Sequence, residues 1–289
     1  MTRSLWRSSS TTARVISYVV LVVATIYILV PFLWAVENSI KSSLDTFTPG
    51  KFIPWLQFSP TLSSWRSVVN DPNVPLALKN SIVISLGTTL MVLILGTPAA
   101  YALARYEFKW KSRDIALWFL SQRVMPPAVV LVPFYVMMIH FPIFHVTLLD
   151  SQIGMILVYT TFNLAFGVVI MRDIFRDINK EIEEAARVDG AGDLKIFYQI
   201  ALPLSLDGLI TTAVIVFAFS WNEALFAATL TSRAAVTLPV HILASRSTRG
   251  VDFNTASVNT LIAIIPPVIL SFFVQRYLAR GLSFGAVKG

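Results

Sequence analysis

Residues 184–203 read EAARVDGAGDLKIFYQIALP, a polar stretch that separates two long apolar segments. Ala185 and Ala186 are strong helix formers, while Gly190 and Gly192 are suited to a stop and a turn. The stretch therefore predicts a helix, a glycine turn and a second short helix. Its carboxylates have no nucleophile or histidine beside them, so the pattern favours docking on another protein over catalysis.

The sequence on either side of the glycines supplies start and stop signals. Asn179 is suited to cap the first helix, and acidic residues follow it in the first turn. Asp193 is expected to cap the second helix, and Pro203 to lie in the first turn of the next membrane helix. Gly190 is expected to need a positive φ or a close approach, so Gly190→Val or Gly190→Asp should disturb the turn and the docking that it supports.

The composition of the 289 residues is that of a membrane protein: 55% are hydrophobic, 13% are charged, and the mean hydropathy is +0.69. Six apolar runs reach the ~20 residues that a helix needs to cross a bilayer. They lie at 15–36, 80–104, 115–139, 152–171, 207–229 and 256–278. Barrel strands are shorter and alternate in polarity. The runs predict one all-α, polytopic membrane domain over residues 1–289 with six transmembrane helices.

Positive charge predicts the orientation of these spans. If both termini are cytoplasmic, the inside segments hold 15 of the 23 Lys and Arg residues and the outside segments hold 7. Residues 37–79 then form a Pro-rich external loop, 172–206 a cytoplasmic loop and 279–289 a cytoplasmic tail. The first span is expected to remain uncleaved, because it is too long for a signal peptide. Contact with the lipid surface accounts for the net charge of +7 without any nucleic acid.

A few polar side chains fall inside the spans and are candidates for a translocation path. An ionisable group in a bilayer is costly and usually faces protein or a water-filled cavity. The candidates are Arg123, Asn163, Trp221, Asn222 and Glu223. A structural role in helix packing is the alternative for each of them. Pro126, Pro127 and Pro133 are expected to kink the third span. No cysteine is present, the histidines lack metal-ligand spacing, and no catalytic constellation is visible, so neither a metal site nor an enzyme is predicted.

Several stretches of the sequence resemble a known family. The pattern EAAxxDGAxxxxxFxxIxLP of permeases of ATP-binding-cassette (ABC) importers is matched at every position of residues 184–203. Asn80-Ser81-Ile82, the stretch 99–105, Trp221-Asn222-Glu223 and the tail from Gly285 resemble the carbohydrate-uptake branch. The chain is most similar to the smaller, six-helix permease subunit of maltose-type importers, over nearly its whole length.

The resemblance implies a role for the cytoplasmic loop. In the family, this EAA loop carries a coupling helix that sits in a cleft of a cytoplasmic ATPase subunit. That role would fall to Glu184, Ala185, Ala186, Asp189, Gly190, Ala191, Phe197 and Pro203. The C-terminal tail would also contact the ATPases, through Gly285, Lys288 and Gly289.

The resemblance also implies partners and a location. They are a second permease subunit, two ATPase subunits that bind ATP and Mg, and an external solute-binding protein, at a bacterial cytoplasmic (inner) membrane. The chain itself needs no cofactor. Its Gly50-Lys51 pair has no phosphate-loop context, so ATP hydrolysis is expected in the partners.

Three readings of the transported solute and its energy source stay open. The first is a sugar or oligosaccharide importer, in which the other permease would hold most of the sugar. The second is the same importer for an anionic solute, such as an acidic saccharide or a glycerol phosphate. The third is an ion-coupled secondary transporter, which should show acid relays and an inverted repeat. Glu223 is the one carboxylate deep in a predicted span, and no repeat is visible.

Overall fold

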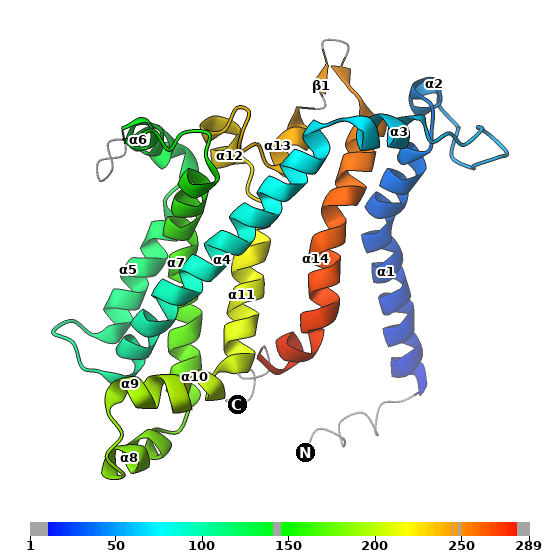
Figure 1. Cartoon of the computed structure of the whole chain (residues 1–289). Coiled ribbons are helices and arrows are strands. Elements are labelled where there is room, and N and C mark those ends of the chain that lie inside the picture. The colour runs from blue at the N-terminus through cyan, green and yellow to red at the C-terminus, as the bar shows by residue number, and fades with distance from the viewer. Residues whose placement is uncertain (1–10, 141–145, 245, 248–249, 282–289) are drawn as a thin grey trace. The chain divides into compact units, whose positions relative to one another are not determined.

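The computed structural model describes residues 11–140, 146–244, 246–247 and 250–281 (Figure 1). Contacts divide the chain into two compact units, where the sequence predicts one domain. Unit 1 comprises Met1–Asp71 and Ser245–Ile262, and unit 2 comprises Pro72–Ala244 and Ala263–Gly289. The helix α14 (Phe253–Gly281) contributes its first turns to unit 1 and the rest to unit 2. Both units are built almost wholly from helices, as the long apolar runs predict.

Unit 1 joins the first helix to the start of the last one. It contains α1 (Thr11–Ser39), α2 (Ser43–Phe47), α3 (Ser63–Asn70) and a short antiparallel hairpin of β1 (Arg246–Ser247) and β2 (Gly250–Val251). The buried Asn254 amide donates to the carbonyls of Asn38, at 2.8 Å, and Lys41, at 3.0 Å. These bonds tie the start of α14 to the end of α1. Short helices and turns replace any long helix in residues 37–79, as the prolines of that segment predict.

Four of the described helices are long and apolar enough to cross a bilayer: α1, α4 (Asn73–Arg105), α7 (Gln152–Asp177) and α14. Two bent pairs raise the number to six if each counts as one span. In the first pair, α5 (Ser112–Val124) meets α6 (Pro127–Ile139) at 88°. In the second, residues 193–204 meet α11 (Leu206–Trp221) at 75°.

Breaks interrupt two of the predicted spans, and the first break is the kink expected from Pro126 and Pro127. The segment 115–139 turns by nearly a right angle at Met125 and Pro126, because a proline disfavours helical conformation in the residue before it. Pro133 lies inside α6 and does not end it. The segment 207–229 is also discontinuous, since α11 ends at Trp221 and α12 (Leu225–Leu230) begins four residues later.

The core of unit 2 is the contact between α4 and α7. These helices approach closely at Gly167, where an added Cβ would collide with the Val92 side chain. Small residues permit such close backbone contact between membrane helices, where van der Waals packing replaces the hydrophobic effect. Ile84, Val92 and Ala100 are fully buried along α4. The α4–α7 pair therefore provides the rigid frame on which the other elements of unit 2 are mounted.

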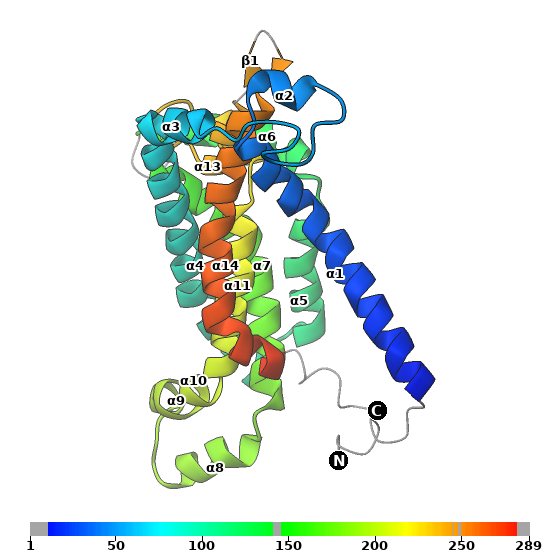
Figure 2. The same cartoon turned by 90° about the vertical axis from the view of Figure 1, so that its right-hand side faces the viewer.

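Unit 2 carries different elements at its two ends (Figure 1 and Figure 2). At one end lie α6, α12 and α13 (Leu238–Leu243). At the other lie α8 (Lys180–Val188), α9 (Asp193–Ile196), the π-helix η1 (Phe197–Ala201) and α10 (Leu202–Leu204). Each end has its own buried cluster, one around Tyr159 and Phe226 and the other around Tyr101 and Phe197.

A single carboxylate organises the loop between α12 and α13. Asp150 has φ +53°, a left-handed conformation that Asp tolerates better than most residues. Its carboxylate accepts the backbone N–H groups of four consecutive residues, Ser232–Ala235, each at 3.0 Å. Partial burial opposes ionisation, but the donors at Ala234, Ser232 and Ala235 outweigh it and lower the pKa of Asp150 to about 2. The Asn80 amide donates to two carbonyls of the same loop, those of Ala234 and Val236.

Asp150→Asn tests this arrangement, because Asn keeps the shape and tolerates the positive φ but lacks the charge. Hydrogen exchange at the amides of 232–235 should become faster at neutral pH. A carboxyl group whose pKa is lowered by folding stabilises the fold at pH values above its pKa in the unfolded chain. That contribution is lost as the pH falls and the group is protonated in the fold. The wild-type advantage in thermal stability should therefore be full above about pH 5 and shrink toward pH 2. A difference that stays constant down to pH 2 would contradict a role for the charge.

Candidate functional site

The EAA loop, residues 172–206, presents one short helix to solvent. Asn179 caps α8 by accepting the N–H of Glu181 at 3.1 Å, as its position in the sequence predicts. Beyond α8, Gly190 has φ +83°, the left-handed conformation expected of the turn. Glu184, Ala185 and Asp189 are exposed, while Ala186 and Ala191 are half-buried. The residues predicted to meet a partner thus lie on a solvent-facing helix and turn.

Two apolar side chains add to the exposed surface of this loop. Val188, the last residue of α8, is 87% exposed, and Leu194 in α9 is 76% exposed. Apolar side chains this open, next to a short helix with small residues, are typical of a surface that another protein covers. The surface comprising the exposed residues of α8, Gly190 and Leu194 is called the docking face below.

Three predicted positions of the loop differ in the structure. Phe197, predicted to take part in the ATPase contact, is only 6% exposed and packs against Tyr101 and Phe175. It anchors the loop to α4 and α7 and does not belong to the docking face. Gly192 occupies the N-cap of α9, and Asp193 lies in the first turn, where its charge still suits the helix dipole. Pro203 is exposed in α10, before the bend that precedes α11.

A buried ion pair links α8 to α4. Glu183 is 1% exposed and Arg105, at the end of α4, has 4% of its side chain exposed; their nearest atoms are 2.8 Å apart. The Tyr101 hydroxyl donates to the same carboxylate at 2.9 Å. The motif pattern draws attention to Glu184 and misses Glu183, although Glu183 is the residue that the fold encloses. This group of residues, together with the Ile178 carbonyl, is called the Glu183 joint below.

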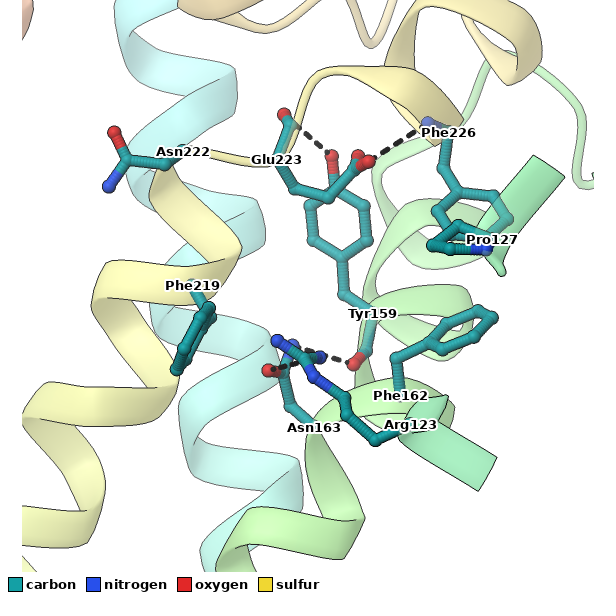
Figure 3. Close-up of a pocket in the computed structure, with 9 residues that line it drawn as sticks. All are labelled: Arg123, Pro127, Tyr159, Phe162, Asn163, Phe219, Asn222, Glu223 and Phe226. Carbon is teal, nitrogen blue, oxygen red and sulfur yellow. Dashed lines mark hydrogen bonds between the residues drawn. The ribbon is translucent and has the colours of Figure 1, made fainter. Parts of the chain in front are cut away.

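Within the membrane segments, four of the five predicted path residues meet at one cavity of about 300 Å³ (Figure 3). They are Arg123, Asn163, Asn222 and Glu223, from α5, α7 and the link between α11 and α12. Aromatic rings form much of the remaining wall. The other lining residues are Pro127, Tyr159, Phe162, Phe219 and Phe226. The aromatic residues among them could not be singled out from the sequence, since apolar rings in an apolar span carry no distinguishing signal.

Arg123 lies beside a stacked pair of aromatic rings, Phe166 and Phe219, whose centres are 4.9 Å apart. Its guanidinium carbon lies 4.4 Å from the ring centre of Phe166 and 4.6 Å from that of Phe219. Its Nη1 donates a long hydrogen bond of 3.4 Å to the Asn163 side-chain oxygen. Among the described residues no carboxylate forms an ion pair with it. Arg123 therefore faces the cavity with hydrogen-bond donors that a solute could occupy.

Glu223 has its carboxylate engaged by the protein. One oxygen accepts the N–H groups of Leu225, at 2.8 Å, and Phe226, at 3.0 Å, at the start of α12. The Tyr159 hydroxyl donates to the Glu223 carbonyl at 3.3 Å (Figure 3). Glu223 thus orders the break between α11 and α12, as an acidic residue at a helix N-terminus does. The carboxylate also lines the cavity, where its negative charge interacts electrostatically with Arg123.

Trp221 does not line this cavity, contrary to the prediction. It is 3% exposed, stacks on Phe217 at 5.6 Å and donates its indole N–H to the Ala263 carbonyl at 3.1 Å. Asn222 does line the cavity, but its amide donates to the Ala218 carbonyl at 2.9 Å. The residues of the Trp-Asn-Glu triplet therefore have different roles. Trp221 secures α11 against α14, and Glu223 orders the turn into α12.

Comparison with known proteins identifies the family. The model of the family described as "Binding-protein-dependent transport system inner membrane component" matches residues 93–284. The chain belongs to this family. It is 35% identical to the trehalose transport system permease protein SugB of Mycobacterium tuberculosis, over 91% of this chain and 93% of that protein. It is 30% identical to the trehalose/maltose transport system permease protein MalG of Thermococcus litoralis, over 96% and 97%.

A solved structure shares the fold. The chain matches one chain of a bacterial ABC transporter involved in the import of the acidic polysaccharide alginate, with a TM-score of 0.75. The match covers 93% of this chain and 98% of that one at 22% identity. The predicted resemblance to ABC-importer permeases is thus confirmed, and the EAA loop and the cavity both fall within the matched family region. Gly285, Lys288 and Gly289 of the predicted tail contact lie outside the described residues.

Proposed function

We propose that the chain is the permease subunit of an ATP-driven importer for a sugar or oligosaccharide. This proposal rests on one observation: the exposed helix α8 is attached to the same α4–α7 pair that supports the cavity. Two cytoplasmic ATPase subunits would bind ATP and Mg, and closure of that pair would move α8 and favour one of two access states. A second permease subunit and an external solute-binding protein complete the assembly.

The docking face is the proposed ATPase contact. A short helix laid into a groove of a partner is a common mode of recognition. The small side chains of Ala185 and Gly190 allow a close approach, and Val188 supplies apolar area. Phe197 contributes from inside the loop by holding it against α4. The tail residues Gly285, Lys288 and Gly289 remain proposed as a further contact.

This assignment orients the chain in the membrane. α8 must face the cytoplasm, where ATP is available, at a bacterial inner membrane. The positive-charge bias of the sequence gives the same orientation, with both termini cytoplasmic. The end of unit 2 that carries α12, α13 and the Asp150 loop then faces outward, toward the binding protein.

The cavity is suited to a polyhydroxy solute. Aromatic rings can stack on the apolar faces of a sugar, while Arg123 and Asn163 offer hydrogen-bond partners to hydroxyl groups. Its volume of about 300 Å³ is at the lower end of the usual range for small-molecule sites. Two relatives that each match more than nine-tenths of this chain carry trehalose or maltose in their names, which supports the same class.

An anionic saccharide is the second candidate solute, and Arg123 is the observation that favours it. A guanidinium without an ion-pair partner among the described residues can bind a carboxylate or a sulfonate as well as hydroxyl groups. Competition for uptake between neutral disaccharides and acidic saccharides of the same size separates the two candidates. Inhibition only by the acidic series would favour the second.

The assembly itself is tested by purification and reconstitution. The tagged chain is isolated from its native membrane, and its partners are identified by mass spectrometry. We expect a second permease and a P-loop ATPase, and proteoliposomes containing the whole assembly should take up solute only with ATP and the binding protein. Uptake by this chain alone, without ATP, would overturn the proposal in favour of a secondary transporter.

Arg123→Ala tests the path through the cavity. Loss of a hydrogen bond to a charged group should lower uptake by about tenfold or more. Assembly with the ATPase and the basal rate of ATP hydrolysis should be unchanged, since Arg123 is remote from the docking face. Arg123→Lys retains the charge and should keep part of the activity. Uptake at the wild-type rate in Arg123→Ala would exclude Arg123 from the path.

A further inference from the structure

The Glu183 joint brings three elements of unit 2 together. The Arg105 Nε donates to the Glu183 carboxylate at 2.8 Å, and its Nη2 donates to the Ile178 carbonyl, just beyond the end of α7, at 3.1 Å. The other oxygen of Glu183 accepts the Tyr101 hydroxyl. The ends of α4 and α7 and the first turn of α8 are therefore fixed by one connected set of charge-assisted bonds, which are shorter and stronger than neutral ones.

Glu183 is the sole buried residue of α8. The apolar residues of this helix do not hold it in place, because Ile182 is 46% exposed and Val188 is 87% exposed. The Arg187–Asp193 pair between α8 and α9 is long, at 3.3 Å, and largely exposed, and such pairs contribute little. Arg187 of α8 also interacts with Tyr106, beside the end of α4, at the surface. Within the described residues, the enclosed contact that orients α8 on unit 2 is therefore the one made by Glu183.

Stability alone does not explain a buried ion pair here. Desolvation of the two charges offsets much of their attraction, and well-packed apolar residues in their place are often as stable. Arg105 also leaves its Nη1 buried without a partner among the described residues, which lowers stability further. A guanidinium and a carboxylate fix each other's orientation, which an apolar contact does not. The ion pair can therefore set the orientation of α8 relative to α4.

We infer that Glu183 is a positioning residue that transmits motion between the docking face and α4. The inference rests on the proposed function, in which a motor subunit moves α8. A push on α8 passes through Glu183 to Arg105 and Tyr101 on α4. The α4–α7 pair then carries it to the cavity wall, to which α7 contributes Tyr159, Phe162 and Asn163. Glu184 of the motif lies outside this route, exposed on the docking face.

The orientation of α8 can be measured on the full chain without any partner. The protein contains no cysteine, so spin labels can be attached to Leu90→Cys on α4 and Val188→Cys on α8 in lipid nanodiscs. The labelled parent should show a narrow distance distribution by pulsed electron resonance. Glu183→Gln should broaden it, whereas Glu107→Gln, which changes an exposed carboxylate beside the end of α4, should not. An unchanged distribution in Glu183→Gln would overturn the inference.

A double replacement separates positioning from packing. Arg105→Met with Glu183→Leu removes both charges and fills the space, so we expect folded protein at the parent level. If the Glu183 joint fixes the orientation of α8, the distribution of label distances stays broad in this variant. In the reconstituted importer the number of solute molecules moved per ATP should then fall by about tenfold. If the double variant regains the narrow distribution and normal coupling, the joint is only packing and the inference is wrong.

The same experiments distinguish this inference from the proposed function. If the wild-type assembly shows no ATP-driven uptake, the proposed function fails, and the label distances still decide whether Glu183 orients α8. If uptake is normal in the wild type but the label distances do not respond to Glu183→Gln, the function stands and the positioning role fails.

Discussion

Gly190→Val is expected to lower uptake by about tenfold or more while the protein remains folded, because a left-handed φ costs an L-residue roughly 1–2 kcal/mol and a β-branched one more. Gly190 has φ +83°, and an added Cβ there would meet nothing within 4 Å. The penalty therefore acts on the backbone of the turn alone. The turn after α8 should shift and misalign the docking face. Uptake and ATP hydrolysis in proteoliposomes, with thermal unfolding of the purified chain, measure the effect.

The loop offers a matched control for this prediction. Gly192 also has open space around its Cβ position, but no left-handed φ, and it occupies a helix N-cap, where Ser is favoured. Gly192→Ser should therefore be neutral and Gly190→Ser impaired. Gly190→Asn should be milder than Gly190→Val, because Asn adopts the left-handed conformation more readily. If Asn were as harmful as Val, the cause would be lost space for the partner and not the backbone angle.

The local structure of the EAA loop was predictable because its signals are local. Asn179 as a cap and Gly190 as a left-handed turn depend on residues within one helical turn, and both are found as expected. The cap of α9 was misassigned by one residue, since Gly and Asp adjoin there and either can precede a helix. The bend between α5 and α6 was partly visible in the prolines, but its angle depends on packing against α7.

The sequence does not predict which way a side chain points when the residues that it contacts are far away in the sequence. Glu183 and Glu184 look equivalent in the sequence, and the partner that buries Glu183 is Arg105, 78 residues earlier. Trp221 lies beside two cavity residues, yet its ring is directed to α14 because the Ala263 carbonyl offers a partner for its indole N–H. Hydropathy locates a span along the chain but gives no direction around the helix axis.

Phe197→Ala should produce the largest loss of stability among these variants. Phe197 is 6% exposed and packs against Tyr101 at 5.0 Å and Phe175 at 6.3 Å between ring centres. Truncation of a buried Phe leaves a cavity and typically costs about 3–5 kcal/mol. Because Tyr101 also belongs to the Glu183 joint, loosening the packing of Phe197, Tyr101 and Phe175 should make the orientation of α8 less defined. Thermal unfolding in nanodiscs measures the first effect, and the Leu90–Val188 label distance measures the second.

Leu194→Ala is the control for Phe197→Ala, because Leu194 lies one turn earlier in the same loop but is 76% exposed. Its truncation should change stability by no more than about 0.5 kcal/mol. Phe197→Leu, which keeps most of the volume, should fall between the two. If Phe197→Ala unfolded at the same temperature as Leu194→Ala, Phe197 could not be the anchor of the loop. Its place in the motif would then have to come from contact with a partner, as the sequence pattern alone had suggested.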